Sequence, residues 1–234
     1  MEGNWFRSYF RRARNMRQMD INSTFCQMMY ICFSPHKLTK TTTMRKTIKH
    51  HWSRDDPAFA VMLIAGLGIA SLAYAIALTN EGFYGLIKAL FSSIVVHFLI
   101  LGCAIAYINY RVIENHMIKE EIKYSGAGSK VEWLYCFDVH CNSFLPVFLM
   151  CYVLQYFLLP VLLYENFISV LISALLNVSA LSYYFYITSQ GFSALPFLKN
   201  TEYFLVPIAG VFLIGIVAVI FRVNITKLII TLHF

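Results

Sequence analysis

The sequence predicts an all-α integral membrane protein with five transmembrane helices and cytosolic amphipathic helices in its N-terminal segment. Of its 234 residues, 59% are hydrophobic and only 13% are charged, the mean hydropathy is +0.61, and the apolar residues form long runs. A soluble domain has about 45–50% apolar and about 25% charged residues, so one small globule cannot bury this excess. A bilayer can accept it, because a helix satisfies its own backbone hydrogen bonds.

Five apolar runs are long enough to cross a hydrocarbon core of about 30 Å as helices that rise about 1.5 Å per residue. They are residues 58–79, 86–110, 144–164, 167–188 and 203–221. Residues 1–57 precede this membrane domain (58–221), and residues 222–234 form a short tail. The third and fourth runs meet at Tyr164-Glu165-Asn166, where a tight hairpin fits. The alternative is that these two runs form a re-entrant hairpin.

The distribution of Lys and Arg predicts the orientation. Residues 1–57 contain eleven Lys or Arg and four Asp or Glu, and therefore hold the whole net charge of +7. Connections 111–143 and 189–202 also carry cations, whereas 80–85 and 164–166 carry none. Since cytosolic loops are enriched in Lys and Arg, we expect a cytosolic N-terminus and a lumenal C-terminus.

The basic N-terminal segment predicts contact with anionic lipid of the cytosolic leaflet, which attracts each nearby cation by about 1 kcal/mol. Residues 5–12 mix aromatic side chains with arginines, as interfacial segments do. The apolar run 25–33 is too short to span and predicts an interfacial or core-packed helix that ends at Ser34-Pro35. RNA is an alternative partner for an arginine-rich arm, although no RRM or KH signature is present.

Three short patches combine polar and turn-forming residues. In the first patch, residues 52–59, Asp56 suits a helix N-cap and Pro57 suits the first helical position. Arg54 is expected to pair with Asp55 or with a lipid phosphate. The third patch, residues 191–201, predicts a shaped turn that packs against the bilayer or other cytosolic segments.

The second patch, residues 131–142, predicts an amphipathic surface helix or a polar plug among the spans. Asp138 and His140 could serve acid–base chemistry, but an i,i+2 pair on a helix faces different sides. Cys136, Asp138, His140 and Cys141 match no familiar zinc spacing, so no metal or other cofactor is expected. The candidate partner-binding or structural positions in the three patches are Arg54, Asp55, Asp56, Pro57, Glu132, Trp133, Asp138, His140, Asn142, Pro196, Lys199 and Asn200.

Three polar residues lie inside the predicted spans: His97, Gln155 and Asn177. Such groups are costly in lipid and are expected to face the bundle interior. They would form hydrogen bonds between helices or line a path for a lipid or solute. This second reading leads to an alternative function, a lipid-handling protein such as a scramblase or lipid sensor.

At these patches the chain resembles the uncoordinated-fifty (UNCL-type) family of Golgi membrane proteins. The matching segments occur in family order over nearly the whole chain. They are Arg17-Gln18-Met19-Asp20, Gln27-Met28 through Ser34-Pro35, Trp52 to Phe59, Val131-Glu132-Trp133, Phe137-Asp138-Val139-His140, Asn142, Phe144, Pro146 and Ser193 to Thr201. Together these segments form a specific signature.

The resemblance implies a five-span Golgi protein, with relations to the ER and the inner nuclear membrane, that acts in vesicular trafficking and is not an enzyme. It implies association with Arf guanine-nucleotide exchange factors and with cell-surface delivery of receptors as cargo. An RNA-binding role at the inner nuclear membrane is a further alternative that it implies. The first expectation is therefore an adaptor whose cytosolic face recruits or positions an exchange factor.

Overall fold

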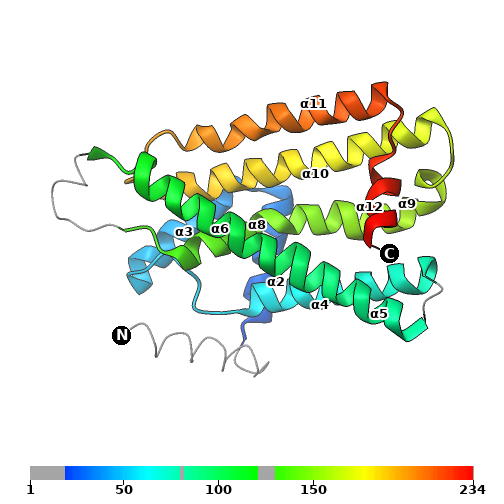
Figure 1. Ribbon diagram of the computed structural model, residues 1–234. Coiled ribbons are helices and arrows are strands. Elements are labelled where there is room, and N and C mark those ends of the chain that lie inside the picture. Colours follow the sequence, from blue (N-terminus) through cyan, green and yellow to red (C-terminus); the bar gives the residue numbers. More distant parts are fainter. Residues whose placement is uncertain (1–18, 80–81, 121–129, 234) are drawn as a thin grey trace. The chain divides into compact units, whose positions relative to one another are not determined.

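The computed structural model describes residues 19–79, 82–120 and 130–233, and 84% of these residues are helical (Figure 1). The described residues contain helices and one isolated antiparallel bridge, between Ile118 and Leu198. The predicted interfacial segment 5–12 lies outside the described residues. The all-α fold class is confirmed.

Within the described part of the chain, five helices are long and apolar enough to cross a membrane, which agrees with the predicted number of spans. They are α4 (Ala58–Leu78); α5, η2, α6 and η3 (Gly82–Leu90, Phe91–Ile100, Leu101–Val112, Ile113–Met117); α8, η4 and α9 (Trp133–Val147, Phe148–Leu154, Gln155–Leu162); α10 (Phe167–Ser193); and η5 with α11 (Thr201–Leu205, Val206–Ile220). The segments η2, η3 and η4 are π-helical, with wider turns than an α-helix. A membrane protein with five long helices is thus the architecture of the chain.

Several of these helices extend beyond the apolar runs in the sequence. The second helix runs from Gly82 to Met117, around the predicted 86–110, and the third begins at Trp133. The second patch is therefore not a separate surface helix but the first turns of the third long helix. Hydropathy marks only the apolar part of a helix. The helical backbone can continue into a polar segment, provided that the polar side chains there also find hydrogen-bond partners.

The chain divides into two compact units. Unit 1 comprises Met1–Ala65, Gly102–Asn142 and Ile187–Thr201, and unit 2 comprises Gly66–Leu101, Ser143–Tyr186 and Glu202–Phe234. All three sequence patches fall within unit 1, although they lie far apart along the chain.

Unit 1 begins with two short helices. Helix α2 (Ile21–Phe33) starts where the Asp20 carboxylate accepts a hydrogen bond from the Ser23 backbone N–H at 3.0 Å, and it ends at Ser34 as the sequence predicts. Helix α3 (His36–Lys49) ends at His50, which adopts a left-handed conformation with φ 61°. The Lys46 ammonium donates to the His50 carbonyl at 2.6 Å and so supports this helix end.

In unit 2, the predicted tail contains a helix, α12 (Ile225–His233), that the sequence reading does not anticipate. The buried Thr226 hydroxyl donates to Gln155 Oε1 at 3.3 Å and accepts from the Ser173 hydroxyl at 3.0 Å and the Asn177 amide at 3.3 Å. Asn224 donates to the Leu162 carbonyl at 2.6 Å. The cost of burying these polar groups is offset because they satisfy one another, which attaches α12 to α9 and α10.

Replacing Thr226 with valine should lower the free energy of unfolding by about 1–2 kcal/mol, since several buried groups lose a partner while the volume stays similar. Thermal unfolding of the purified protein in detergent measures this. The control is Thr231→Val, at an exposed position of α12 whose hydroxyl donates to the Lys227 carbonyl of the same helix. Equal melting temperatures for the two variants would show that the buried network does not hold α12.

Candidate functional site

The three sequence patches meet in the core of unit 1. The Trp52 ring of the first patch lies 6.4 Å from the Tyr135 ring of the second and 6.0 Å from the Phe197 ring of the third. Tyr135 also contacts the third patch through its hydroxyl, which donates to the Gly191 carbonyl. The aromatic rings are buried, so their contacts join segments that lie far apart in the sequence.

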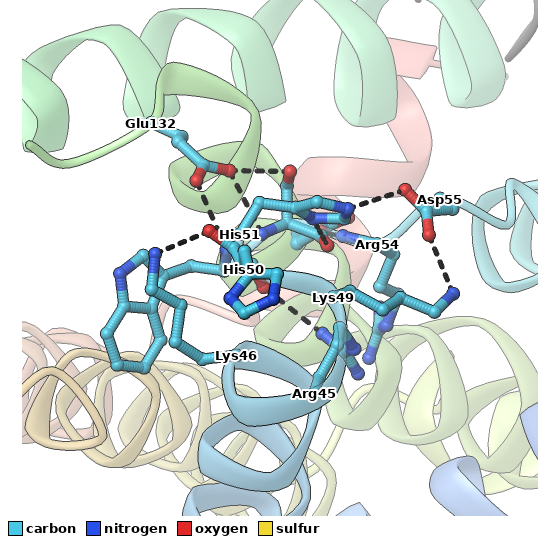
Figure 2. A network of polar contacts seen from close by, with 11 residues as sticks. Arg45, Lys46, Lys49, His50, His51, Arg54, Asp55 and Glu132 are labelled. Carbon is cyan, nitrogen blue, oxygen red and sulfur yellow. Dashed lines mark hydrogen bonds and ion pairs between the residues drawn. The ribbon is translucent and has the colours of Figure 1, made fainter.

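Glu132 holds the segment between α3 and α4 (Figure 2). Its carboxylate accepts the backbone N–H groups of Trp52 and Ser53 at 3.1 Å each, and the Ser53 hydroxyl at 2.6 Å. Arg45 donates to the Trp52 carbonyl at 3.3 Å from the α3 side. A loop lacks the regular hydrogen bonds of a helix or sheet. The side chains of Glu132 and Arg45 bond its backbone groups instead and so fix its conformation.

Arg54 lies at the buried end of this segment and is only 6% exposed. Its backbone N–H donates to Asp138 Oδ2 at 2.6 Å, its guanidinium donates to Asn142 Oδ1, and the guanidinium lies 4.2 Å from the centre of the Phe59 ring. The expected pairing of Arg54 with Asp55 is wrong. The buried Asp138 of the second patch also interacts electrostatically with Arg54.

Asp55 and Asp56 have other partners. The Asp55 carboxylate forms an ion pair with Lys49 at 2.6 Å and lies 3.0 Å from His51 Nε2, and both partners are partly solvent-exposed (Figure 2). Asp56 accepts the Ala58 N–H at 3.0 Å, as the capping prediction requires, and the Asp20 N–H at 2.8 Å. Pro57 is buried directly before α4. Asp56 thus caps α4 and also contacts the residue that caps α2.

The remaining residues of the second patch pack rather than face solvent. The Trp133 ring stacks on Phe137 with centroids 6.0 Å apart and planes 13° apart. The His140 ring is buried, and a Cβ added at Gly102 would overlap it. Among the described residues, no group of three His, Cys, Asp or Glu side chains could hold a metal ion. The environment is that of a close-packed core, which allows no substrate approach to Asp138 or His140.

The third patch presents its polar residues outward. The Pro196 carbonyl accepts from Lys119 Nζ at 2.6 Å, and Lys199 Nζ lies 3.7 Å from Glu120 Oε1. Asn200 is exposed and has φ 56°. Backbone bonds join this turn to the end of the second long helix: Lys119 N–H to the Phe197 carbonyl at 3.1 Å, and Lys199 N–H to the Met117 carbonyl at 2.8 Å. Pro196, Lys199 and Asn200 are thus the outward-facing members of the candidate set.

Helix α2 presents an exposed apolar stripe that the candidate positions omit. We define the α2 stripe as Ile21, Phe25, Met29 and Phe33, spaced four residues apart. Phe25 is 56% exposed and Phe33 77% exposed, whereas Thr24 and Ile31 face inward. The i,i+4 spacing is visible in the sequence, but the spacing alone cannot show which face of the helix becomes buried.

Helix α3 adds positive charge to unit 1. It contains no acidic residue, and its cations are Lys37, Lys40, Arg45, Lys46 and Lys49. Burial and the neighbouring Arg54 lower the pKa of Arg45, and the carboxylate of Asp138 opposes that shift. Unit 1 therefore combines a rigid core built from the three patches with a basic helix and an exposed apolar stripe.

Comparison with known proteins gives a consistent set of relatives. The sequence model of the UNC-50 family matches residues 9–234. The chain is 42% identical to "Protein unc-50 homolog" of Dictyostelium discoideum over 97% of the chain and 86% of that protein. It is 32% identical to "Protein GMH1" of Saccharomyces cerevisiae (93% and 82%) and 35% identical to "Protein unc-50 homolog" of Homo sapiens (88% and 78%). No solved structure matches the chain.

Proposed function

The chain belongs to the UNC-50 family of membrane proteins, and from this premise we propose that it is a non-enzymatic Golgi protein of vesicular trafficking. Unit 1 recruits or positions an Arf guanine-nucleotide exchange factor and thereby supports delivery of receptors to the cell surface. In this proposal the N-terminus is cytosolic and the C-terminus lumenal, as the distribution of Lys and Arg favours.

The observation that carries this proposal is the exposed α2 stripe. Four apolar side chains at i, i+4, i+8 and i+12 form the type of surface that a helix presents to an apolar groove of a protein partner. Large aromatic side chains such as Phe25 and Phe33 contribute most to such interfaces. Leaving both exposed in a free monomer is costly unless a partner covers them.

The surrounding charge supports the same role. The cations of α3 favour a partner with an acidic surface, and they also attract anionic lipid of the cytosolic leaflet. Lipid attraction of this kind would hold α3 against the membrane on which an exchange factor acts. The buried patches then serve as the frame of the platform, and Pro196, Lys199 and Asn200 belong to its surface.

The proposal is tested with the double variant Phe25→Asn and Phe33→Asn. Co-precipitation of the exchange factor from detergent extracts should fall at least about tenfold, because a buried aromatic anchor contributes about 2 kcal/mol or more to an interface. Recruitment of the exchange factor to Golgi membranes in cells that lack the endogenous protein is the second measurement. Both readouts should return with the unaltered chain.

The matched control is Thr43→Asn with Thr47→Asn, at two exposed positions of α3. This control should bind and recruit the exchange factor as the unaltered chain does. If the Phe25 and Phe33 variant also binds normally, the α2 stripe is not the docking surface. If exchange-factor localisation is unchanged in cells without the protein, the recruiting function itself is wrong.

A further inference from the structure

Unit 2 contains a cavity of about 340 Å³ among its helices. Its lining comes from α4, η2, α6, α8, η4, α9, α10 and α12, and includes Tyr74, His97, Tyr152, Gln155 and Asn177. Its volume lies in the lower part of the range of about 300–1,000 Å³ for small-molecule sites. The space therefore suits one compact ligand or the polar end of a larger lipid.

The polar side chains of this cavity are hydroxyl, amide, thiol and imidazole groups. His97 Nδ1 and the Tyr152 hydroxyl are hydrogen-bonded at 2.8 Å, and Asn177 Nδ2 donates to the Ser173 carbonyl at 2.9 Å. The described residues that line the cavity include no Lys, Arg, Asp or Glu. A phosphate or ammonium headgroup would lose its hydration here without gaining a counter-charge, which is strongly unfavourable.

The remaining lining is apolar and reaches the lipid-facing surface of unit 2. Phe144, Val147 and Ile230 contribute hydrocarbon walls. Leu101 and Leu181 also line the cavity and are 48% and 43% exposed. Since exposed side chains on the spanning helices contact lipid, an apolar molecule has a route into the cavity from the bilayer.

The backbone at the two central polar residues is unusual. His97 lies in η2 and Tyr152 lies in η4, both of which are π-helical. The wider turns of π-helical segments occur frequently at functional sites. Two such segments therefore place the His97–Tyr152 pair at the cavity wall, among otherwise apolar helices.

From these features we infer that the cavity binds the hydroxyl-bearing end of one neutral lipid. The hydroxyl pairs with the His97–Tyr152 and Gln155–Asn177 groups, each of which has capacity for more than one hydrogen bond. The apolar body lies against Phe144, and its far end reaches the Leu101–Leu181 opening. A sterol and a diacylglycerol share this chemistry. The inference is independent of exchange-factor recruitment.

The test uses the purified full-length chain in lipid nanodiscs with photoreactive probes. The probes are a sterol, a diacylglycerol and, for comparison, a phosphatidylcholine. We expect saturable cross-linking by a hydroxyl probe to peptides of η4 and α10, and competition by the same lipid without the reactive group. Preference for the sterol or the diacylglycerol identifies the source of the hydroxyl.

Two tryptophan variants of α10 make the test specific to the cavity. Leu181→Trp fills the opening, whereas Leu175→Trp changes a 57% exposed residue outside the lining. Cross-linking should fall about tenfold in Leu181→Trp, equivalent to about 1.4 kcal/mol, and stay unchanged in Leu175→Trp. Tyr152→Phe keeps the ring and removes the hydroxyl. It should lower cross-linking and leave the melting temperature unchanged.

Either of two results overturns the inference. One is that neither hydroxyl probe labels the protein more than the phosphatidylcholine probe does. The other is equal labelling of Leu181→Trp and Leu175→Trp, with Tyr152→Phe also unchanged. Because the two tryptophan variants are compared on one helix at matched melting temperature, a folding defect cannot imitate the expected result.

Discussion

Replacing Asp138 with alanine is expected to lower the free energy of unfolding by about 3 kcal/mol, because a buried backbone N–H loses a charged hydrogen-bond acceptor. Asp138 is buried, accepts the Arg54 backbone N–H at 2.6 Å, and interacts electrostatically with Arg54 and Arg45. Without the carboxylate, the Arg54 backbone N–H loses its acceptor and the buried guanidinium loses a nearby negative charge. The first patch then loses its attachment to α8.

Thermal unfolding in detergent measures this effect. A protein of about 150–250 residues melts about 2–4 °C lower for each kcal/mol, so a decrease of about 10 °C is expected. Asp55→Ala is the control, since the partly exposed pairs of Asp55 with Lys49 and His51 contribute about 1 kcal/mol at most. Equal melting of the two variants would contradict the assignment of Asp138 as the structural anchor of unit 1.

Gly102→Ala is expected to destabilise the protein by up to about 3 kcal/mol, the usual range for an overpacked core. The added Cβ would overlap the imidazole of His140, which is buried and has little room to move. In an open helix the same substitution stabilises by about 1 kcal/mol, so the sign of the change identifies the close approach. Melting temperature and the yield of monodisperse protein report the effect.

Two further variants separate this packing from a general effect of alanine. A Cβ at Gly210 in α11 meets no atom of the described residues within 4 Å, so Gly210→Ala should be neutral or slightly stabilising. Adding His140→Ala to Gly102→Ala removes the overlapping ring, so the double variant should lose less stability than the sum of the single variants. Strict additivity would show that the two residues do not pack as described.

These expectations separate framework residues from surface residues in the candidate set. Arg54, Asp138 and Asn142 are buried, and changing them tests folding before it tests partner binding. Lys199 and the α2 stripe are accessible, and changing them tests recruitment. A binding experiment on variants of the buried residues alone could not distinguish unfolding of unit 1 from loss of its contacts with the partner.

The number of spanning helices and the α-helical class follow from composition and from the length of the apolar runs. A bilayer requires about twenty apolar residues in each spanning helix, and that requirement is visible in a linear sequence. Capping by Asp56 and the end of α2 at Ser34 are also local, because cap and turn chemistry depends on neighbours along the chain. These features could be predicted for that reason.

Contacts between distant segments could not be predicted from the sequence. Examples are the partner of Arg54, the contacts of Trp52 and the packing of α12. Asp138 lies 84 positions from Arg54, and Thr226 lies 71 positions from Gln155. Which distant polar groups satisfy one another depends on how the helices pack, since a buried group pairs with whatever acceptor the fold brings near. The cavity around His97 and Tyr152 likewise exists only between packed helices, where the shapes of side chains from many segments leave a space.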